Sequence, residues 1–357
     1  EIRLSSDRGI EMEPAQLNEA TGYLRANDHI TLMATTDDVG NVGKLEPIRI
    51  LANNIKVEVL AAGDAQIVGI QNGEDALVLD KVLSDGSFSA LADNSIIITS
   101  NIGVEKNITL TSVNGDIVTL PGVNGALDSV NGTNAYLDPS ENGGSVITLE
   151  ARNGNVGTED NAVRILHRKD AVIDVQAENA WLQGATDYDR LWPDVTMTLR
   201  NVRVGNVFSA ESSENLNINE AIDENGGTIN SVEAGTVNLI AGNSIDMNGA
   251  VISAKGDLTA NAEGSITSTA ALEANGNVTV YAKGRVATTG AVKALNNVEI
   301  QGVGGTAQTG AVTAEEGNIK VTGCGDVTTE GKLSAEKGAI TVTSLTGNVE
   351  VKDGAVA

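Results

Sequence analysis

The chain has 357 residues and a formal net charge of −25, and 41% of its residues are hydrophobic but only 2% are aromatic. Because compact domain cores usually take much of their buried area from Phe, Tyr and Trp, this composition argues against a globule and favours a narrow interior filled by aliphatic side chains. The acidic balance argues against nucleic acid and anionic lipid as partners. No stretch is apolar enough for a membrane helix, and the single cysteine excludes a disulfide framework.

The first 23 residues, which include "EMEPAQLNEATGY", fit poorly into any repeat. We predict that residues 1–23 form an irregular leading coil or the edge of a neighbouring module. The chain begins at Glu1 without a Met or a charged and then apolar leader, which favours a mature or excised segment of a longer protein.

Residues 24–137 and 138–248 are predicted to be two copies of one module. The matching stretches are "GNVGKLEPIRI" (40–50) with "GNVGTEDNAVRI" (154–165), and "VLDKVLSDGSFSA" (78–90) with "TLRNVRVGNVFSA" (198–210). This match makes the only two Phe residues, Phe88 and Phe208, equivalent, so we interpret both as core residues.

Residues 249–357 repeat every 20–22 residues, and each unit contains short runs of alternating apolar residues. Alternation with a period of two is typical of a strand with one buried face, and its recurrence at a fixed spacing predicts that each unit is one coil of a parallel β-helix. The predicted inward columns are Ile252, Leu272, Val292, Val312, Leu333; Ala254, Ala274, Ala294, Ala314, Ala335; Leu258, Val278, Val298, Ile319, Ile340; Ala260, Val280, Ile300, Val321, Val342; and Ile266, Val286, Thr306, Val327, Val349.

Turn residues fall between the strands at two fixed places, which we predict to be corners with left-handed backbone angles. The corner columns are Gly256, Gly276, Asn296, Gly317, Gly338 and Gly264, Gly284, Gly304, Gly325, Gly347. Beside the first corner, Asn277, Asn297 and Asn318 are predicted to stack as an amide ladder that fixes the register between coils. About 21 residues per coil gives roughly 16 or 17 coils, and about 4.8 Å between strands predicts a rod on the order of 80 Å long.

The chain resembles the shaft repeats of filamentous haemagglutinin-like exoproteins and related giant bacterial surface adhesins. The resemblance rests on "HITLMATTDDVGNVGKLEPIRI" (29–50), "SVITLEARNGNVGTEDNAVRI" (145–165) and "GNVTVYAKGRVATTGAV" (276–292), and it covers most of residues 24–352. It implies an all-β, right-handed parallel β-helix, an extracellular or cell-surface location, and a role as a stalk or adhesive fibre. The family's secretion domain and C-terminal anchor or toxin are missing, which also favours a segment of something longer.

An insertion of about five residues in the second copy places "TDYDRLWPD" (186–194) in a surface loop. Aromatic rings beside carboxylates suit sugar stacking or a protein partner, and the same carboxylates could bind Ca²⁺, although the known calcium-binding motifs are absent. The candidate ligand-binding residues are Asp187, Tyr188, Asp189 and Trp192. We predict no catalytic residue, no metal ligand and no other cofactor.

Parallel β-helices also include polysaccharide lyases and glycosidases, which cluster carboxylates with Lys, Arg or His on one exposed face. In this sequence Asp and Glu are scattered, and His29 and His167 share no motif. Cys324 belongs to a column with Glu263, Lys283, Val303 and Thr346, which predicts an exposed thiol without a catalytic neighbour.

We therefore expect a non-enzymatic shaft segment that acts in attachment or cell–cell contact. Its partners would be neighbouring repeats or other subunits at the open coil ends, or a glycan or protein on a host or neighbouring cell. A β-helical polysaccharide lyase or hydrolase, and a subunit that polymerises end to end into a filament, remain the alternatives.

Overall fold

A computed structural model describes residues 1–12, 22–36, 41–70, 73–120, 135–139, 144–166, 171–185, 196–223 and 225–357. The described residues form strands and turns but no helix. Thirty-nine of their strands belong to parallel ladders, and two short strands form an antiparallel hairpin. The chain divides into two compact units, Glu1–Val195 and Thr196–Ala357, which are described separately below.

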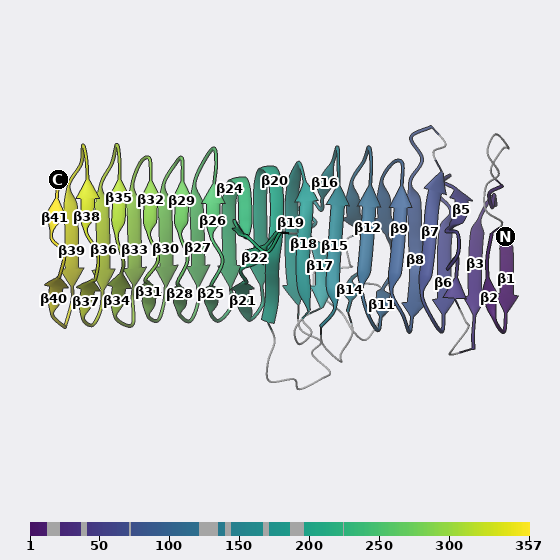
Figure 1. Cartoon of the computed structure of the whole chain (residues 1–357), viewed down its shortest axis with the longest axis horizontal. Helices are drawn as coiled ribbons and strands as arrows, with labels where there is room; N and C mark the ends of the chain where they lie inside the picture. The colour runs from purple at the N-terminus through teal and green to yellow at the C-terminus, as the bar shows by residue number, and fades with distance from the viewer. Residues whose placement is uncertain are drawn as a thin grey trace. The chain divides into compact units, whose positions relative to one another are not determined.

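Unit 1 contains nineteen strands among its described residues (Figure 1). They are β1 (Ile2–Ser6), β2 (Gly9–Ile10), β3 (His29–Ala34), β4 (Asn41–Val42), β5 (Ile48–Leu51), β6 (Lys56–Ala61), β7 (Ala65–Ile70), β8 (Leu77–Ser84), β9 (Phe88–Ala92), β10 (Ile96–Ile98), β11 (Ile102–Val104), β12 (Ile108–Ser112), β13 (Ile117–Thr119), β14 (Leu137–Asp138), β15 (Val146–Ala151), β16 (Asn155–Val156), β17 (Val163–Leu166), β18 (Val172–Ala177) and β19 (Asn179–Ala185).

The beginning of unit 1 is more regular than the sequence suggests. Strand β1 pairs in parallel with β3 over its whole length, and β2 pairs with β4. Residues 13–21, which carry most of the irregular motif, lie outside the described residues.

The described parts of the two matching stretches of unit 1, from Asn41 and from Gly154 onward, adopt the same local structure. Strands β4 and β5 both pair with β7, and β16 and β17 both pair with β19. The second glycine of each stretch, Gly43 or Gly157, has a left-handed φ of 69° or 72°. In each case a Cβ atom would lie 2.9 Å from a backbone nitrogen, that of Ile48 or Val163, so the tight loop between the two short strands requires glycine.

Unit 2 contains twenty-two strands among its described residues. They are β20 (Thr196–Ser212), β21 (Asn215–Ile218), β22 (Ala221–Ile222), β23 (Thr228–Ile229), β24 (Val232–Ala241), β25 (Ile245–Met247), β26 (Val251–Ser253), β27 (Leu258–Ala262), β28 (Ile266–Ser268), β29 (Leu272–Ala274), β30 (Val278–Ala282), β31 (Val286–Thr288), β32 (Val292–Ala294), β33 (Val298–Gly302), β34 (Ala307–Thr309), β35 (Val312–Ala314), β36 (Ile319–Gly323), β37 (Val327–Thr329), β38 (Leu333–Ala335), β39 (Ile340–Ser344), β40 (Val349–Val351) and β41 (Ala355–Val356).

From β26 to β38, every strand of unit 2 pairs in parallel with the strand three places further along the chain. One ladder runs β27–β30–β33–β36–β39, and two others begin at β26 and β28 (Figure 1). We call each set of three successive strands from β26 onward a rung. Side chains alternate between inward and outward along each strand, so the inward residues of successive rungs stack into columns.

Most positions in the predicted columns of unit 2 are confirmed, and two of the five columns are correct throughout. Val312, Ala314, Ile319, Val321 and Val327 are all fully buried, and the columns that begin at Leu258 and Ala260 have the predicted register. Side chains of the last strands are more exposed, such as Val349, Val351 and Val356 at 47%, 37% and 55%, since no described strand pairs with their far edge.

Two of the predicted columns are wrong by one residue at one rung. The register places Val251 and Ser253 beside Leu272 and Ala274, so Ile252 and Ala254 point outward. Because the side-chain period of a strand is two, a slip of one residue exchanges the buried and the exposed face.

The second slip occurs at β34, where Ala307 replaces the predicted Thr306 in the inward column. The neighbouring corner position is correspondingly Gly305 and not Gly304, because the Gly325 amide donates to the Gly305 carbonyl. The register also places Leu345, not Thr346, in the column of Cys324. Gly323 pairs with Ser344, and the amide of Leu345 donates a hydrogen bond to the Gly323 carbonyl.

The prediction of left-handed corners is also wrong. None of the predicted corner glycines of unit 2 has a positive φ, and neither does Asn296, the one non-glycine residue in these columns. Glycine is required there because successive rungs approach closely: a Cβ atom at Gly284 would lie 2.7 Å from the Gly264 carbonyl oxygen. Crowding by the preceding rung, and not a left-handed backbone, therefore favours glycine at corners such as Gly284.

This close approach predicts unequal losses of stability for two alanine substitutions in one corner column. Gly284→Ala is expected to lower the free energy of unfolding by about 1–3 kcal/mol, because backbone must move to admit the methyl group. Gly325→Ala is the matched control, since its nearest neighbour would be the Thr306 methyl group at 3.5 Å. Urea denaturation of both variants tests this, and equal losses would contradict the steric explanation.

The predicted asparagine ladder is confirmed, and it is longer than expected. Asn297 donates from Nδ2 to Asn277 Oδ1 at 3.0 Å, and Asn318 donates to Asn297 Oδ1 at 3.3 Å. The ladder begins at Asp257, whose Oδ1 accepts from Asn277 Nδ2 at 3.0 Å, and it ends where Asn318 Oδ1 accepts from the Ala339 amide at 2.8 Å. The row is largely exposed, so it fixes register along a solvent-facing corner.

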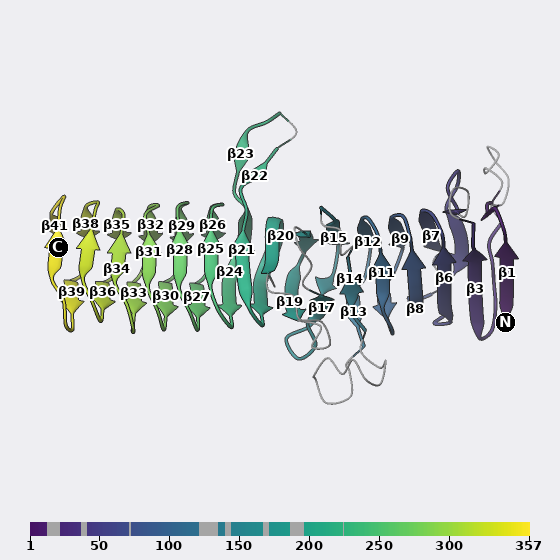
Figure 2. The same cartoon turned by 90° about the horizontal axis from the view of Figure 1, so that it is seen from below.

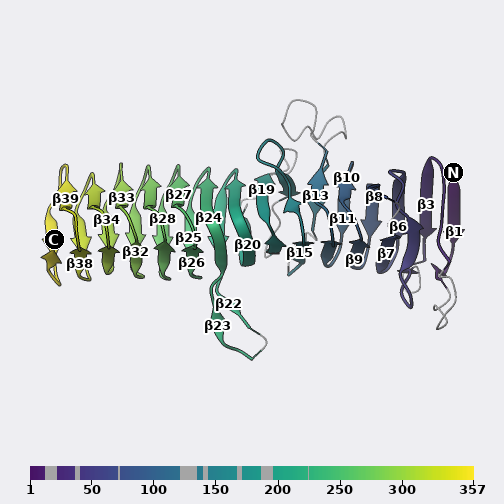
Figure 3. The ribbon, with the colours of Figure 1, turned by 90° about the horizontal axis from the view of Figure 1, so that it is seen from above.

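A hairpin of unit 2 was not predicted. Strands β22 and β23 pair antiparallel and project from the parallel strands of the unit (Figures 2 and 3). Asp223 Oδ1 accepts hydrogen bonds from the amides of Asn225 and Gly227, and Gly226 has a left-handed φ of 81°. Ile222 is 63% exposed on this hairpin.

Candidate functional site

The predicted ligand-binding residues Asp187, Tyr188, Asp189 and Trp192 lie outside the described residues, as does His167. Trp181, which precedes them in β19, is partly exposed. Cys324 is partly exposed rather than fully exposed. Within the part of the chain that is described, no three His, Cys, Asp or Glu side chains are grouped so that they could hold a metal ion.

A polar cluster lies on the outward side of β3, β6 and β8 in unit 1. His29 Nε2 lies 3.7 Å from Glu58 Oε2, and the Thr31 hydroxyl donates to the same oxygen at 3.4 Å. Parallel pairing places His29 beside Lys56 and Thr31 beside Glu58, which is why these polar groups meet. The contact between His29 and Glu58 was not predicted, because the two residues are far apart in the sequence and only the strand register brings them together.

Asp80 belongs to the same face and occupies a bulge. Val57 pairs with Leu79 and Glu58 pairs with Lys81, which leaves Asp80 as the extra residue of β8. Its Oδ1 lies 3.1 Å from Lys56 Nζ and accepts a hydrogen bond from the Thr99 hydroxyl at 2.7 Å.

The electrostatics around Asp80 favour a fixed ion pair over proton transfer by this carboxyl group. Partial burial raises the pKa of Asp80, but the hydrogen bonds from Thr99 and Lys56 and the positive charge of Lys56 outweigh burial, so the pKa is lowered from 3.8. A general acid at neutral pH needs a raised carboxyl pKa instead.

The lowered pKa predicts a pH-dependent contribution to stability. Asp80 stabilises the fold fully above its ordinary pKa of 3.8, and this contribution is lost as pH falls through the lower folded-state pKa. We expect Asp80→Asn to reduce stability near neutral pH, and the difference from wild type to shrink on acidification. Urea melts between about pH 7 and about pH 2 measure it. Thr99→Val should show part of the same effect, and parallel pH profiles for wild type and Asp80→Asn would contradict the assignment.

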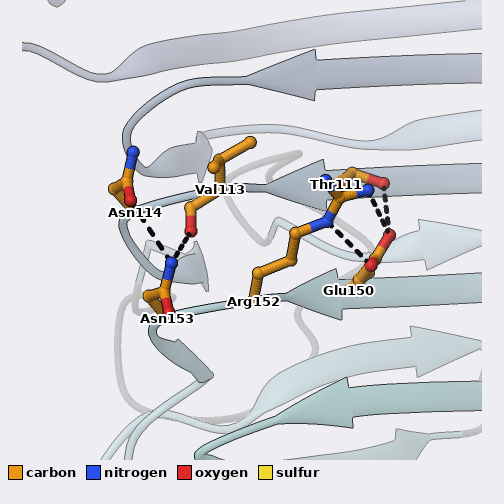
Figure 4. Close-up of polar contacts among 6 residues, drawn as sticks. All are labelled: Thr111, Val113, Asn114, Glu150, Arg152 and Asn153. Atoms are coloured by element: carbon orange, nitrogen blue, oxygen red, sulfur yellow. Dashed lines mark hydrogen bonds and ion pairs between the residues drawn. The ribbon is translucent and has the colours of Figure 1, made fainter.

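A second polar group in unit 1 links β12 with β15 and the turn after it (Figure 4). Arg152 Nε donates to Glu150 Oε1 at 2.9 Å, and the Thr111 hydroxyl donates to Glu150 Oε2 at 3.3 Å. Asn153 Nδ2 donates to the Val113 carbonyl at 2.8 Å and to Asn114 Oδ1 at 3.3 Å. Glu150 and Asn153 each bind a residue about 40 positions earlier, so this group joins two turns of the chain.

Described residues of unit 2 line at least two surface hollows. The larger, of about 590 Å³, is lined by Glu211, Ile240, Asn261, Glu263 and Tyr281, together with Ser212, Ser213, Ala241, Gly242 and Ala262. The smaller, of about 200 Å³, lies around Glu273, Lys293 and Glu315. The larger hollow was not predicted from the sequence, although Tyr281 is the only tyrosine after residue 195 and occupies an outward position of "VTVYA".

No helix in the described part of the chain is long and apolar enough to cross a membrane. No family model matches the sequence, and no match was found among curated proteins or solved structures.

Proposed function

We propose that the chain is a right-handed parallel β-helix and serves as a structural shaft segment of an extracellular or cell-surface adhesin or filamentous exoprotein. The observation that carries this proposal is the constant three-strand step of the ladders from β26 to β41, with like side chains stacked in register. A right-handed crossover is the strong preference for parallel strands joined in this way.

Contacts between rungs support a role that depends on length. Each added rung repeats the same ladder hydrogen bonds and buried aliphatic columns, so stability adds approximately rung by rung. Surface ion pairs also join neighbouring rungs. Lys320 lies 2.7 Å from Glu299, and Lys352 lies 2.9 Å from Glu330. Such exposed pairs contribute little individually, but they favour correct register over a slipped one.

Changing the number of rungs tests the shaft proposal. Duplicating residues 270–329, which adds three rungs in register, should give a folded protein about 14 Å longer by small-angle X-ray scattering. Deleting residues 290–299 is the matched control, because half a rung breaks the columns and should prevent cooperative folding. A duplicated chain that unfolds, or that folds without lengthening, would overturn the proposal.

The attachment role needs a separate measurement. Latex beads coated with the full chain should be retained on cultured epithelial cells or on bacterial lawns more strongly than beads coated with albumin. The three-rung duplication should retain beads equally well, since a shaft tolerates changes in length. Equal retention of albumin and of the full chain on both surfaces would overturn attachment while leaving the shaft test intact.

Cleavage of a polysaccharide is the second candidate function, and the cluster of His29, Glu58, Lys56 and Asp80 supports it. Two carboxylates, a histidine and a lysine share one outward face there. Release of reducing ends or of unsaturated sugars from a polysaccharide panel, abolished by Glu58→Gln but not by Glu150→Gln, would establish it. No turnover on the panel would overturn it.

A further inference from the structure

The larger hollow of unit 2 lies along a single outward column of side chains. Parallel pairing places Glu211 beside Ile240, Ile240 beside Asn261, and Asn261 beside Tyr281. These four residues are the outward lining of the hollow, and the small buried residues Ala241 and Ala262 neighbour them on the strands. Three strand spacings of about 4.8 Å make the column about 14 Å long, so the hollow extends across several strands.

The hollow combines an aromatic ring with hydrogen-bonding groups that the protein leaves open. The structure gives the side chains of Glu211, Asn261 and Tyr281 no hydrogen-bond partner among the described residues. Glu263, at the side of the hollow, is paired with Lys283 and so is already neutralised. A carboxylate, an amide and a phenol therefore surround a surface that also contains Ile240.

This combination matches the chemistry of a sugar ring. The apolar C–H face of a pyranose can pack on an aromatic ring, while its hydroxyls donate to a carboxylate and exchange hydrogen bonds with an amide. The uncompensated charge of Glu211 and the net charge of −25 disfavour sulfated or uronate sugars. The ligand class that fits is a neutral oligosaccharide.

We propose that the hollow along Glu211, Ile240, Asn261 and Tyr281 is a binding site for neutral oligosaccharides. The proposal rests on the proposed attachment function, for which it names the ligand class and the contact residues. Tyr281 supplies the stacking surface, and Glu211 and Asn261 orient the sugar hydroxyls.

Calorimetric titration of the full chain with cello-, xylo- and chito-oligosaccharides tests the site, and heparin-derived oligosaccharides provide the anionic arm. At least one neutral sugar should bind, Tyr281→Ala should weaken its binding about tenfold, and Tyr281→Phe should keep most of it. Glu211→Gln should weaken binding without affecting the fold. Thr322→Ala is the matched control, because Thr322 lies in the same outward column but outside the hollow, and its effect should be under about twofold.

Three results would overturn the site: no binding of any neutral sugar, binding that Tyr281→Ala leaves unchanged, or stronger binding of the heparin fragments. Thermal melts of each variant show whether a loss of binding reflects unfolding. The rung-duplication test does not involve Tyr281, so failure of the sugar site and failure of the shaft proposal are distinguishable.

Discussion

Replacing Phe208 with alanine is expected to lower the free energy of unfolding by about 3–5 kcal/mol. Phe208 is fully buried in β20, where it pairs with Val237 of β24, and the close-packed core around a deleted benzyl group would relax only in part and leave a cavity. Chemical denaturation followed by circular dichroism measures the loss.

Val207→Ala provides the matched control, because Val207 precedes Phe208 on the same strand and is 36% exposed. Its expected loss is under about 1 kcal/mol. Phe88→Ala should resemble Phe208→Ala, since Phe88 is also fully buried. A loss at Phe208 no larger than that at Val207 would show that the ring does not fill the core.

The buried faces of unit 2 could be predicted from the sequence because one physical rule governs them. Alternation with a period of two and a nearly constant repeat length place Val278, Val298 and Ile319 in one column, and the structure agrees. The rule fails where a corner gains or loses a residue. Two adjacent positions could each face inward at these rungs, Val251 or Ile252 and Thr306 or Ala307, and all four residues are apolar or small, so composition alone could not choose the register.

The role of the corner glycines could not be read from the sequence either. Glycine is common both where φ is positive and where another backbone approaches closely, and the amino-acid sequence does not distinguish these two causes. Gly43 and Gly284 illustrate them: the first has a φ of 69°, while the second has an ordinary φ and a carbonyl oxygen above it.

Contacts between outward side chains were the hardest to anticipate. Asp80 meets Thr99, and Glu58 meets His29, only because strands far apart in the chain pair in one register, and a bulge at Asp80 changes that register locally. The position of Tyr281 in a hollow could not be predicted, because outward residues vary from rung to rung and the repeat pattern does not mark which of them lie together. Its neighbours Asn261 and Ile240 come from preceding strands of the ladder.

Arg49 and Arg164 differ in how many hydrogen bonds their guanidinium groups make to the described residues. The two arginines occupy the same position of the "PIRIL" and "AVRIL" stretches. Arg49 Nε donates to the Gly22 carbonyl at 3.0 Å. Arg164 in β17 is only 5% exposed, and its Nε and Nη1 have no hydrogen-bond partner among the residues that the structure describes. Burial accordingly lowers the pKa of Arg164.

Arg164→Met is therefore expected to stabilise the chain, by about 1–4 kcal/mol, because methionine keeps the apolar stem and removes a buried guanidinium of which two nitrogens lack hydrogen-bond partners among the described residues. Arg49→Met should have the opposite sign and lower the free energy of unfolding by about 1 kcal/mol, since it removes a hydrogen bond to a carbonyl. Urea denaturation of the two variants side by side measures both changes. If Arg164→Met destabilised the chain as Arg49→Met does, the Arg164 charge would have to be compensated in solution, and the measured loss would give the strength of that compensation.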